Sequence, residues 1–481
     1  MSITRFDYKW TALVVVAVGT LAITLDEGAV RIVLPELGRE FGARPDDVVW
    51  VWLIYMLMGA GLVLTFGRLG DALGRKRIYA IGLALFAMGL IFSSIATSLI
   101  QLVGVRALQA TGMAMTVAMS NAIVTASFPA EERGRALGIM GTVVSIGLLT
   151  GPATGGALLD WMGWRAVFYA RIPIALLAVA LALLLRSEPP ERKHHAFDLA
   201  GSATLFTGLA SVLIAINRGQ SSGWTSPFVI GAMALGALLL IAFVRIESRA
   251  SDPVLDLSLF KTRSFSSTNA AHTLFYVASL SLRFVLPYLV LQALSISATI
   301  SGLVVASIEA VRAFVSPLSG HLSDRVGTWV LATGGTAMVA LGTLLMLLTI
   351  RADTGIPYLV LLLSVVGLGA GFFVAPNTSR IMGSVPRQRL GTASAMVATT
   401  RQIGGALGLA LAGTAYTYAY VNASAEASGA GVTSAAVEVQ STLAGFQAVL
   451  VVSLVFALAT LGLLLIARAR QRSADAAAYT S

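Results

Sequence analysis

Nine ionisable side chains lie within stretches of this sequence that are otherwise apolar. Three are acids and six are arginines: Asp26, Glu27, Glu309, Arg31, Arg106, Arg171, Arg283, Arg312 and Arg401. A charge at the centre of a lipid bilayer costs about 3 kcal/mol even on a lenient scale, so these groups are expected to face water or one another. A buried carboxylate beside an arginine can exchange its proton when that pairing changes, because burial and the cation act on its pKa in opposite senses.

Sequence spacing pairs four of these charges locally. Glu27 and Arg31 are four residues apart, and Glu309 and Arg312 are three apart, and residues at these spacings share one face of a helix. Each of these two acids is therefore expected to lie beside the arginine that follows it.

Asp26 is then left to pair with Arg106. At 1.5 Å per helical residue, Asp26 lies roughly 22 Å from the inner end of its span and Arg106 roughly 10 Å from the outer end of its own. Both fall in the outer half of the membrane, and the same count places Arg31, Arg171 and Arg283 there as well. We therefore expect a charged cluster in the outer half, with Arg171 packing in the protein or snorkelling to the outer surface.

These pairings suggest a proton-handling group of Asp26, Glu27 and Arg106; the alternative is a permanent salt bridge that fixes helix packing. Glu309 is the second candidate carboxylate, and three roles stay open: taking a proton, binding a cationic compound or neutralising Arg312. The arginines in the membrane outnumber the acids by three. This excess favours anionic or zwitterionic substrates unless some arginines reach the membrane surface.

The elements that must position these residues are membrane-spanning helices. With 57% hydrophobic and 12% charged residues and a mean hydropathy of +0.83, the chain carries many apolar runs, and a run of about 20 residues can cross a bilayer. The predicted fold class is an all-α polytopic membrane protein. Fourteen spans are predicted, at 11–34, 47–67, 78–97, 99–127, 136–159, 165–185, 199–217, 227–244, 265–291, 298–320, 329–350, 357–379, 390–418 and 442–467.

The distribution of basic residues orients these helices. Segments on the side of the two termini carry 22 Lys and Arg residues, whereas the opposite loops carry five, so both termini are predicted to be cytoplasmic. The first span is expected to stay as a signal-anchor helix, because it is too long for a cleaved signal peptide. The outward segment 419–441 is expected to be mobile and the tail after Arg472 disordered.

Composition also excludes several functions. The basic residues are scattered over many short loops, which argues against nucleic-acid binding. The sequence contains no cysteine, so disulfides, thiol catalysis and cysteine-ligated metals are excluded.

A polar, glycine-rich hinge occurs twice in the chain. Gly67, Leu69, Asp71 and Gly74 recur as Gly320, Leu322, Asp324 and Gly327, each 253 residues further on. The glycines let a helix end turn sharply and pack closely. The aspartates suit the positive end of a following helix, and basic residues such as Arg75 hold the loop on the cytoplasmic side. The chain is therefore an internal duplication.

The hinge and its repeat resemble the signature loop of the major facilitator superfamily. Residues 147–156, Gly-Leu-Leu-Thr-Gly-Pro-Ala-Thr-Gly-Gly, are similar at every position to the fifth-helix antiporter signature G-x-x-x-G-P-x-x-G-G. Here Gly151 and Pro152 permit a kink, while Gly155 and Gly156 let a neighbouring helix approach closely. These residues narrow the resemblance to the fourteen-helix drug/proton antiporter branch.

Three other segments resemble that branch, with departures. Arg106-x-x-Gln109-x-x-Gly112 is similar to the proton-linked motif, although Ala110 stands where a glycine is usual. Leu25-Asp26 with Leu34-Pro35 fits the acidic motif of the first helix, although Gly28 and Arg31 replace a small hydroxylated residue and an asparagine. Trp50-x-x-x-x-Tyr55 and Arg401-Gln402-x-Gly404-Gly405 fit the branch as well.

The resemblance implies two six-helix bundles that alternate access around a central cavity, with two extra helices between them. The predicted domains are 1–186 (N-terminal bundle), 187–263 (linker with the extra helices), 264–467 (C-terminal bundle) and 468–481 (cytoplasmic tail). With the spacing arguments, it assigns proton coupling to Asp26, Glu27, Arg106 and Glu309, and substrate binding to Arg31, Tyr55, Gln109, Tyr276, Arg283, Arg312 and Asn377. It assigns conformational gating to Gly67, Asp71, Gly74, Arg75, Gly151, Pro152, Gly155, Gly156, Gly320 and Asp324.

The predicted function is proton-driven export of small amphipathic compounds, such as drugs, across a bacterial-type plasma membrane. The protein is expected to act as a monomer, without cofactor or metal and without binding nucleic acid. One alternative is a symporter or facilitator for organic anions, against which the antiporter signature argues. Another is a membrane-embedded enzyme or sensor, but the sequence carries no catalytic motif. An ATP-binding motif is also absent, so an ion gradient must drive transport, and the same carboxylates would serve Na⁺ as well as H⁺.

Overall fold

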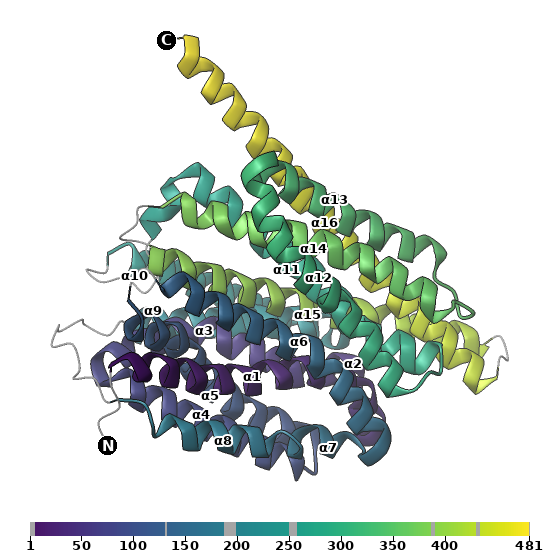
Figure 1. The fold of residues 1–481 in the computed structure, drawn as a ribbon. Coiled ribbons are helices and arrows are strands. Elements are labelled where there is room, and N and C mark those ends of the chain that lie inside the picture. Colours follow the sequence, from purple (N-terminus) through teal and green to yellow (C-terminus); the bar gives the residue numbers. More distant parts are fainter. Residues whose placement is uncertain are drawn as a thin grey trace. The chain divides into compact units, whose positions relative to one another are not determined.

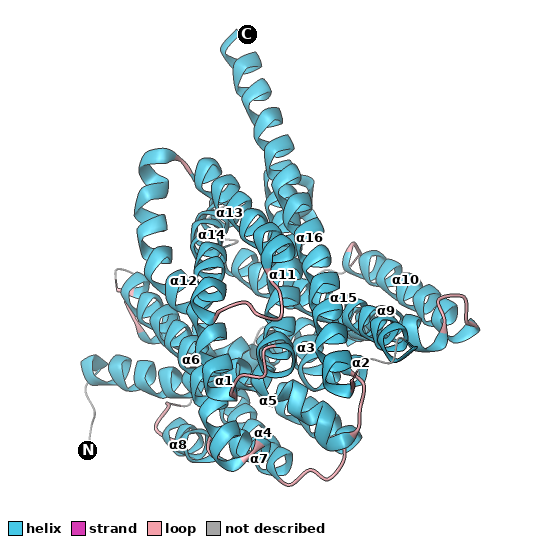
Figure 2. Cartoon of the chain, turned by 90° about the vertical axis from the view of Figure 1, so that its right-hand side faces the viewer, coloured by secondary structure: helices cyan, strands magenta, loops and turns pink. Residues whose placement is uncertain are grey.

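The computed structural model describes residues 5–129, 132–186, 199–249, 257–385, 390–429 and 433–480, and the regular elements formed by these residues are helices (Figures 1 and 2). In chain order they are α1 (Arg5–Phe41), α2 (Pro45–Val48), α3 (Trp50–Leu73), α4 (Arg75–Ser94), α5 (Leu99–Ser127), α6 (Arg133–Met162), α7 (Trp164–Tyr169), α8 (Ile172–Ala182), α9 (Leu199–Ser222), α10 (Pro227–Glu247), η1 (Leu257–Lys261), α11 (Arg263–Tyr288), η2 (Leu289–Ala293), α12 (Ala298–Val326), α13 (Thr328–Thr349), α14 (Ile356–Gly383), α15 (Leu390–Gly429) and α16 (Ser434–Thr480).

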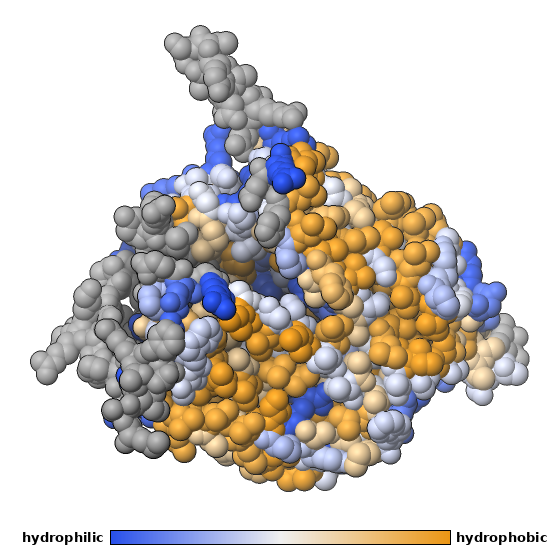
Figure 3. Space-filling model, viewed as in Figure 1, coloured by the Kyte–Doolittle hydropathy of each residue, from blue (hydrophilic) through white to orange (hydrophobic). Residues whose placement is uncertain are grey.

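The helices confirm the predicted membrane protein. Among the described residues, 13 stretches are long and apolar enough to cross a bilayer, and α15, a helix of 40 residues, covers the remaining predicted span at 390–418. Large apolar side chains such as Trp161, Leu183 and Phe314 are strongly exposed, and apolar residues cover much of the surface in Figure 3. Such a surface suits contact with lipid and not with water.

Two sequence expectations about the elements were wrong. The outward segment 419–441, expected to be mobile, is largely helical, because α15 continues to Gly429 and α16 begins at Ser434. The cytoplasmic tail, expected to be disordered after Arg472, continues α16 as a helix to Thr480. The sixth span, predicted at 165–185, is confirmed as one stretch that can cross a bilayer, Trp164–Ala182, with a turn at Ala170 and Arg171 between α7 and α8.

The chain divides into two compact units, each described here by itself. Unit 1 contains Met1–Ala215, Ser222–Val254 and Ile296–Ala306, and unit 2 contains Ile216–Ser221, Leu255–Ser295 and Ser307–Ser481. Unit 1 therefore holds α1 to α8, most of α9, all of α10 and the first turns of α12. Unit 2 holds α11 and α13 to α16 with the remainder of α12.

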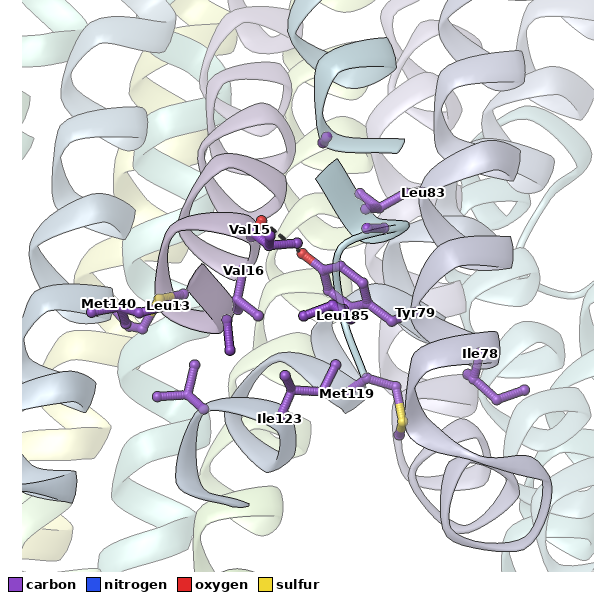
Figure 4. Packing of buried hydrophobic residues seen from close by; sticks show 14 of the residues in the cluster. Leu13, Val15, Val16, Ile78, Tyr79, Leu83, Met119, Ile123, Met140 and Leu185 are labelled. Carbon is purple, nitrogen blue, oxygen red and sulfur yellow. Dashed lines mark hydrogen bonds between the residues drawn. The ribbon is translucent and has the colours of Figure 1, made fainter. Parts of the chain in front are cut away.

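The core of unit 1 lies where α1, α4, α5, α6 and α8 meet, and it is made of aliphatic side chains, methionines, Phe128 and Tyr79; Figure 4 shows part of it. Tyr79 of α4 crosses to α1, where its hydroxyl donates a hydrogen bond of 3.3 Å to the carbonyl oxygen of Val15. A buried tyrosine needs such a partner for its hydroxyl. The same hydroxyl lies against Gly19, where the Cβ atom of any larger residue would collide with it.

The two extra helices belong in large part to unit 1. Phe206 of α9 packs on Gly61 of α3, and the hydroxyl of Thr65 donates a 2.7 Å hydrogen bond to Ser202 one turn away. α10 then packs on α9, with Leu240 against Gly208 (Figure 2).

The duplicated hinge has the same geometry in both copies. Gly74 joins α3 to α4 with φ of 99°, and Gly327 joins α12 to α13 with φ of 92°. Both values lie in the region that favours glycine, so the sharp turn predicted from the repeat is confirmed. Gly67 and Gly320, in contrast, lie inside helices, and a side chain at either position would meet no atom of the described residues within 4 Å.

The helices that follow the two hinges also pack on their neighbours in the same way. Gly82 of α4 lies against the backbone of Gly112 in α5, and Gly335 of α13 lies against the backbone of Gly369 in α14. Gly82 and Gly335 are again 253 residues apart. Backbone contact of this kind is typical of membrane helices that pack through small residues.

Candidate functional site

The predicted pair of Asp26 and Arg106 is present in unit 1. Nη1 of Arg106, on α5, lies 2.7 Å from Oδ2 of Asp26, on α1, and both side chains are fully buried. The same nitrogen donates a 2.7 Å hydrogen bond to Oε1 of Gln109. Nε of Arg106 donates to the carbonyl oxygen of Val51, in α3, at 3.3 Å. Three helices therefore meet at one guanidinium.

Aromatic rings complete the surroundings of this guanidinium. Its central carbon lies 4.6 Å from the ring centre of Tyr55 and 6.0 Å from that of Phe168. A cation over an aromatic face is stabilised by the ring quadrupole, and more so where water is excluded. Tyr55, predicted to contact substrate, thus lies directly beside the ion pair.

Several polar atoms around the pair have no hydrogen-bond partner among the described residues. They are Oδ1 of Asp26, Nη2 of Arg106, Nε2 of Gln109 and the hydroxyl of Tyr55, and all are buried. Buried polar atoms are seldom left unsatisfied in proteins, because each costs about 1–3 kcal/mol. Four such atoms around one carboxylate mark a place that can accept a proton, water or a polar group of a substrate.

Two further charges of the predicted cluster lie close to this pair. Arg171 is buried between α7 and α8, where its guanidinium donates to the carbonyl oxygen of Val167 and contacts the hydroxyl of Thr154. It lies within electrostatic range of both Asp26 and Arg106. Arg171 therefore packs inside unit 1, one of the two outcomes expected for it, and does not snorkel to the surface.

Glu27 and Arg31 stand next to Asp26 on α1. The side chain of Glu27 is half-buried. Nε of Arg31 donates a 3.2 Å hydrogen bond to the backbone oxygen of Glu27, and its guanidinium lies 5.1 Å from the ring centre of Trp52. Arg31 is therefore buried against α3, with contacts to a backbone carbonyl and an aromatic ring.

A second charged group lies in unit 2, around Glu309 of α12. Arg283 of α11 forms an ion pair with Oε1 of Glu309, and Nη2 of Arg312 lies 2.5 Å from Oε2. The sequence predicted only the local pair with Arg312. Arg283 adds a second guanidinium, so one carboxylate is shared between two arginines on two helices.

Tyr276 and Asn377, both predicted to bind substrate, lie near His272 in unit 2. Asn377 is fully buried on α14, and its Nδ2 lies 3.3 Å from both Nδ1 of His272 and the carbonyl oxygen of Thr268. The ring of Tyr276 lies 4.9 Å from that of His272. The contacts of Asn377 with His272 and Thr268 join α14 to α11.

The antiporter signature on α6 packs against the part of α1 that carries Asp26. A side chain at Gly147 would collide with Thr24, one at Gly151 would lie 2.7 Å from the carbonyl oxygen of Leu25, and one at Gly155 would lie 2.8 Å from Ala29. These glycines therefore allow α6 to approach α1 within one turn of Asp26.

The other face of the signature contacts the start of α12 within unit 1. Gly156 lies against the carbonyl oxygen of Ala298, and Gly302 lies against that of Pro152. One turn beyond, Asp160 accepts hydrogen bonds from the backbone N–H groups of Ala298 and Thr299, at 2.9 and 2.7 Å, and from the Thr299 hydroxyl at 2.6 Å. We call this contact between α6 and α12 the α6–α12 clasp.

The structure also adds site residues that the sequence did not single out. Asp160 falls just outside the predicted fifth span, and an acidic residue in a loop gives no signal of a functional role. Trp52 and Phe168 are apolar residues in apolar runs, so no signal in the sequence distinguishes them. The side chains of Asp71 and Asp324 lie outside the described part of the chain. Arg75, half-buried, begins α4 directly after Gly74.

Comparison with known proteins identifies the architecture that holds these residues. The family model described as Major Facilitator Superfamily matches residues 16–212, 195–409 and 271–480. The chain belongs to the major facilitator superfamily. It is similar to a solved bacterial homologue of the human lysosomal transporter Spinster, with a TM-score of 0.71 at 16% identity, covering 96% of this chain and 97% of that one. That likeness concerns the fold alone.

Curated relatives narrow the family membership. The chain is 32% identical to the riboflavin transporter RibZ of Clostridioides difficile, covering 84% of this chain and 87% of the relative. It is 33% identical to the multidrug resistance protein Stp of Mycobacterium tuberculosis (84% and 75%) and 31% identical to the puromycin resistance protein pur8 of Streptomyces alboniger (85% and 82%). These relatives place it in the drug-efflux branch of the superfamily, as a multi-pass membrane transporter and not an enzyme.

Proposed function

We propose that this major facilitator protein is a proton-coupled antiporter that exports small amphipathic compounds by alternating access. Asp26 carries the exchangeable proton, and Arg106 holds the carboxylate between exchanges. The observation that carries the proposal is the buried ion pair, beside which Oδ1 of Asp26 and the hydroxyl of Tyr55 have no hydrogen-bond partner among the described residues. A carboxylate with one bonded and one open oxygen can accept a proton without first losing its cation.

The packing of α6 supports a link between this proton and conformation. Gly147 and Gly151 lie against residues 24 and 25, next to Asp26. Protonation of Asp26 weakens its attraction to Arg106. α1 is then free to shift along the side of α6 that carries Gly147 and Gly151, where no side chain blocks it. The same α6 helix forms the α6–α12 clasp, so a shift of α1 on α6 is transmitted to that contact.

The remaining predicted roles form part of this proposal. Glu27 assists proton transfer, and the duplicated hinge with Gly74, Asp71 and Arg75 controls access on the cytoplasmic side. The bundles 1–186 and 264–467 act as the two moving halves, with 187–263 between them and both termini cytoplasmic. The protein works as a monomer in a bacterial-type plasma membrane.

The test is substrate-evoked proton movement in proteoliposomes that contain a pH-sensitive dye. A panel of cationic, neutral and anionic amphiphiles is applied to the intact protein, to Asp26→Asn and to Asp353→Asn, a matched loss of one carboxylate at an exposed loop position. Substrates should move protons through the intact protein and Asp353→Asn but not through Asp26→Asn. Normal coupling in Asp26→Asn would remove Asp26 from the mechanism. Replacing the proton gradient by a Na⁺ gradient tests the ion.

A second candidate function is proton symport or facilitated transport of organic anions. It is favoured by the two arginines around Glu309 and by the relative named as a riboflavin transporter. The same assay distinguishes the two functions by direction. In antiport, substrate and proton cross the membrane in opposite directions, whereas in symport they move together.

A further inference from the structure

Two guanidinium groups share the carboxylate of Glu309, so these three side chains together carry one positive charge. Within α11 to α14, Glu309 is the single acid before Asp324. A net charge inside a membrane segment is costly unless water or a ligand of opposite charge reaches it.

The exposed part of this group is its cationic part. The side chain of Glu309 keeps 1% of its surface exposed, whereas those of Arg283 and Arg312 keep 10% and 17%. A compound that approaches the group therefore meets the arginine side chains before it meets the carboxylate of Glu309. Guanidinium groups bind carboxylate, sulfonate and phosphate oxygens with paired, charge-assisted hydrogen bonds.

The neighbouring part of α11 suits an aromatic body attached to such an anion. Tyr276 lies two turns before Arg283 on the same helix face, since a spacing of seven residues returns to that face. It keeps a small exposed area beside His272. On the other side of the group, α14 packs on α12 with Gly367 against Ile308 and Val311, a stretch without charged side chains.

We propose that Arg283 and Arg312 form a binding site for the anionic group of an amphipathic substrate, with Glu309 as a built-in counter-ion. Glu309 holds both arginines while the site is empty of substrate and competes with the incoming anion. This inference rests on the proposed transport function and names its substrate class: aromatic compounds that carry a carboxylate, sulfonate or phosphate.

The test uses three dansyl probes that differ only in their end group. Dansyl-taurine carries a sulfonate, dansyl-ethanolamine a neutral hydroxyl and dansyl-ethylenediamine an ammonium. Binding to the purified, full-length protein in detergent is followed by dansyl fluorescence. The intact protein should bind the sulfonate probe most tightly. Arg283→Gln should weaken that probe about tenfold or more, the effect expected for loss of a charge-assisted contact, and leave the neutral probe unchanged.

Matched variants separate the site from general charge effects. Arg351→Gln removes one positive charge from an exposed outer loop and should not change sulfonate binding. Glu309→Gln removes the competing carboxylate and should tighten sulfonate binding several-fold, about the inverse of the arginine effect. Arg283→Lys keeps the charge but loses the paired hydrogen bonds, so an intermediate affinity is expected, and it replaces Arg283→Gln if that variant does not fold.

Three outcomes would overturn the anion site: tighter binding of the ammonium probe than of the sulfonate probe, an equal loss of affinity for the sulfonate and neutral probes in Arg283→Gln, or weaker sulfonate binding in Glu309→Gln.

The proton assay with Asp26→Asn distinguishes failure of the anion site from failure of the proposed transport function. If the sulfonate preference fails while other amphiphiles still drive proton movement, the anion site falls and the exporter stands. If no amphiphile moves protons, the transport proposal itself falls.

Discussion

At the residue scale, Asp26 and Arg106 depend on each other for stability, because both are fully buried in a membrane segment. Removing one member of such a pair leaves a buried, uncompensated charge and costs about 3–5 kcal/mol, whereas removing both costs much less. Arg106→Gln should therefore lower the thermal unfolding temperature more than the double variant Asp26→Asn/Arg106→Gln. The measurement is intrinsic fluorescence during heating of the purified protein. Additive losses in the double variant would show that the pair contributes little.

Variants of Tyr55 can distinguish a structural role of its ring from a chemical role of its hydroxyl. Its ring lies over Arg106, while its hydroxyl has no partner among the described residues. Tyr55→Phe keeps the ring and removes a buried hydroxyl that has no partner among the described residues, so it should not lower stability. If the hydroxyl passes protons or water to Asp26, the rate of substrate-evoked proton movement should fall several-fold.

Tyr55→Leu is the matched control, since it removes the ring as well as the hydroxyl. Loss of the cation–ring contact should then cost about 0.5–2 kcal/mol of stability. A normal transport rate in Tyr55→Phe would exclude the hydroxyl from the proton route and leave Tyr55 with packing alone.

The charged residues show which contacts can be predicted from residue spacing and which cannot. The sequence predicted the pair of Asp26 with Arg106 because the other acids had local partners, and the structure contains that pair. It did not predict the contact of Arg283 with Glu309. A contact between two helices depends on how the helices are rotated against each other, and residue spacing within one helix carries no information about that rotation.

At the element scale, α6 has one face that tolerates larger residues and one that does not. A methyl group at Gly151 would lie 2.7 Å from the Leu25 carbonyl oxygen, whereas one at Gly141 would meet nothing within 4 Å. Gly151→Ala should therefore cost about 1–3 kcal/mol through overpacking and reduce transport strongly. Gly141→Ala should be neutral or stabilise by up to about 1 kcal/mol, because alanine favours helix. Thermal unfolding and the proteoliposome assay measure both effects, and equal behaviour of the two variants would contradict the packing argument.

The α6–α12 clasp offers an independent test of the same helix. Asp160 caps the first turn of α12 with three hydrogen bonds, and loss of a capping side chain costs about 0.5–2 kcal/mol. Asp160→Ala should loosen this turn. Because the chain has no native cysteine, Ser301→Cys provides a single buried thiol in that turn. Its reaction with a membrane-impermeant maleimide should be faster in the Asp160→Ala background, and an unchanged rate would show that the clasp does not hold α12.

Helix positions were predictable where hydropathy changes abruptly and were missed where it does not. The fourth span was predicted at 99–127, the bounds of α5, and in the structure Ser98 caps the first turn of this helix. The division between α7 and α8 falls inside the predicted sixth span, directly before Pro173 in the first turn of α8. Proline lacks the N–H group that would continue the hydrogen bonds of α7. Arg171 turns there to the carbonyl oxygen of Val167 and the hydroxyl of Thr154. The outward ends of α15 and α16 were missed because alanine and serine, read as a mobile loop, also suit helix.

At the scale of the whole molecule, the duplication explains why two hinges share one geometry. Positions 74 and 327 both adopt positive φ, and the helices after them pack through glycines that are again 253 residues apart. A repeat of this kind was visible in the sequence because backbone geometry restricts the residue to glycine. The placement of α9 on α3 was not visible, since Phe206 and Gly61 carry no paired signal.

The orientation of the chain follows from charge and from the number of crossings. With 22 basic residues on one side and five on the other, the positive-inside rule predicts cytoplasmic termini, and fourteen crossings bring the chain back to the side where it began. Single cysteines at exposed positions test this in intact cells, since the native chain has none. Thr97→Cys and Ala352→Cys should react with a membrane-impermeant maleimide from outside, whereas Leu73→Cys and Ala469→Cys should react only after the membrane is permeabilised. Reaction at position 469 in intact cells with position 352 protected would invert the topology. Protons would then reach Asp26 from the opposite side, and the direction proposed for transport would reverse with it.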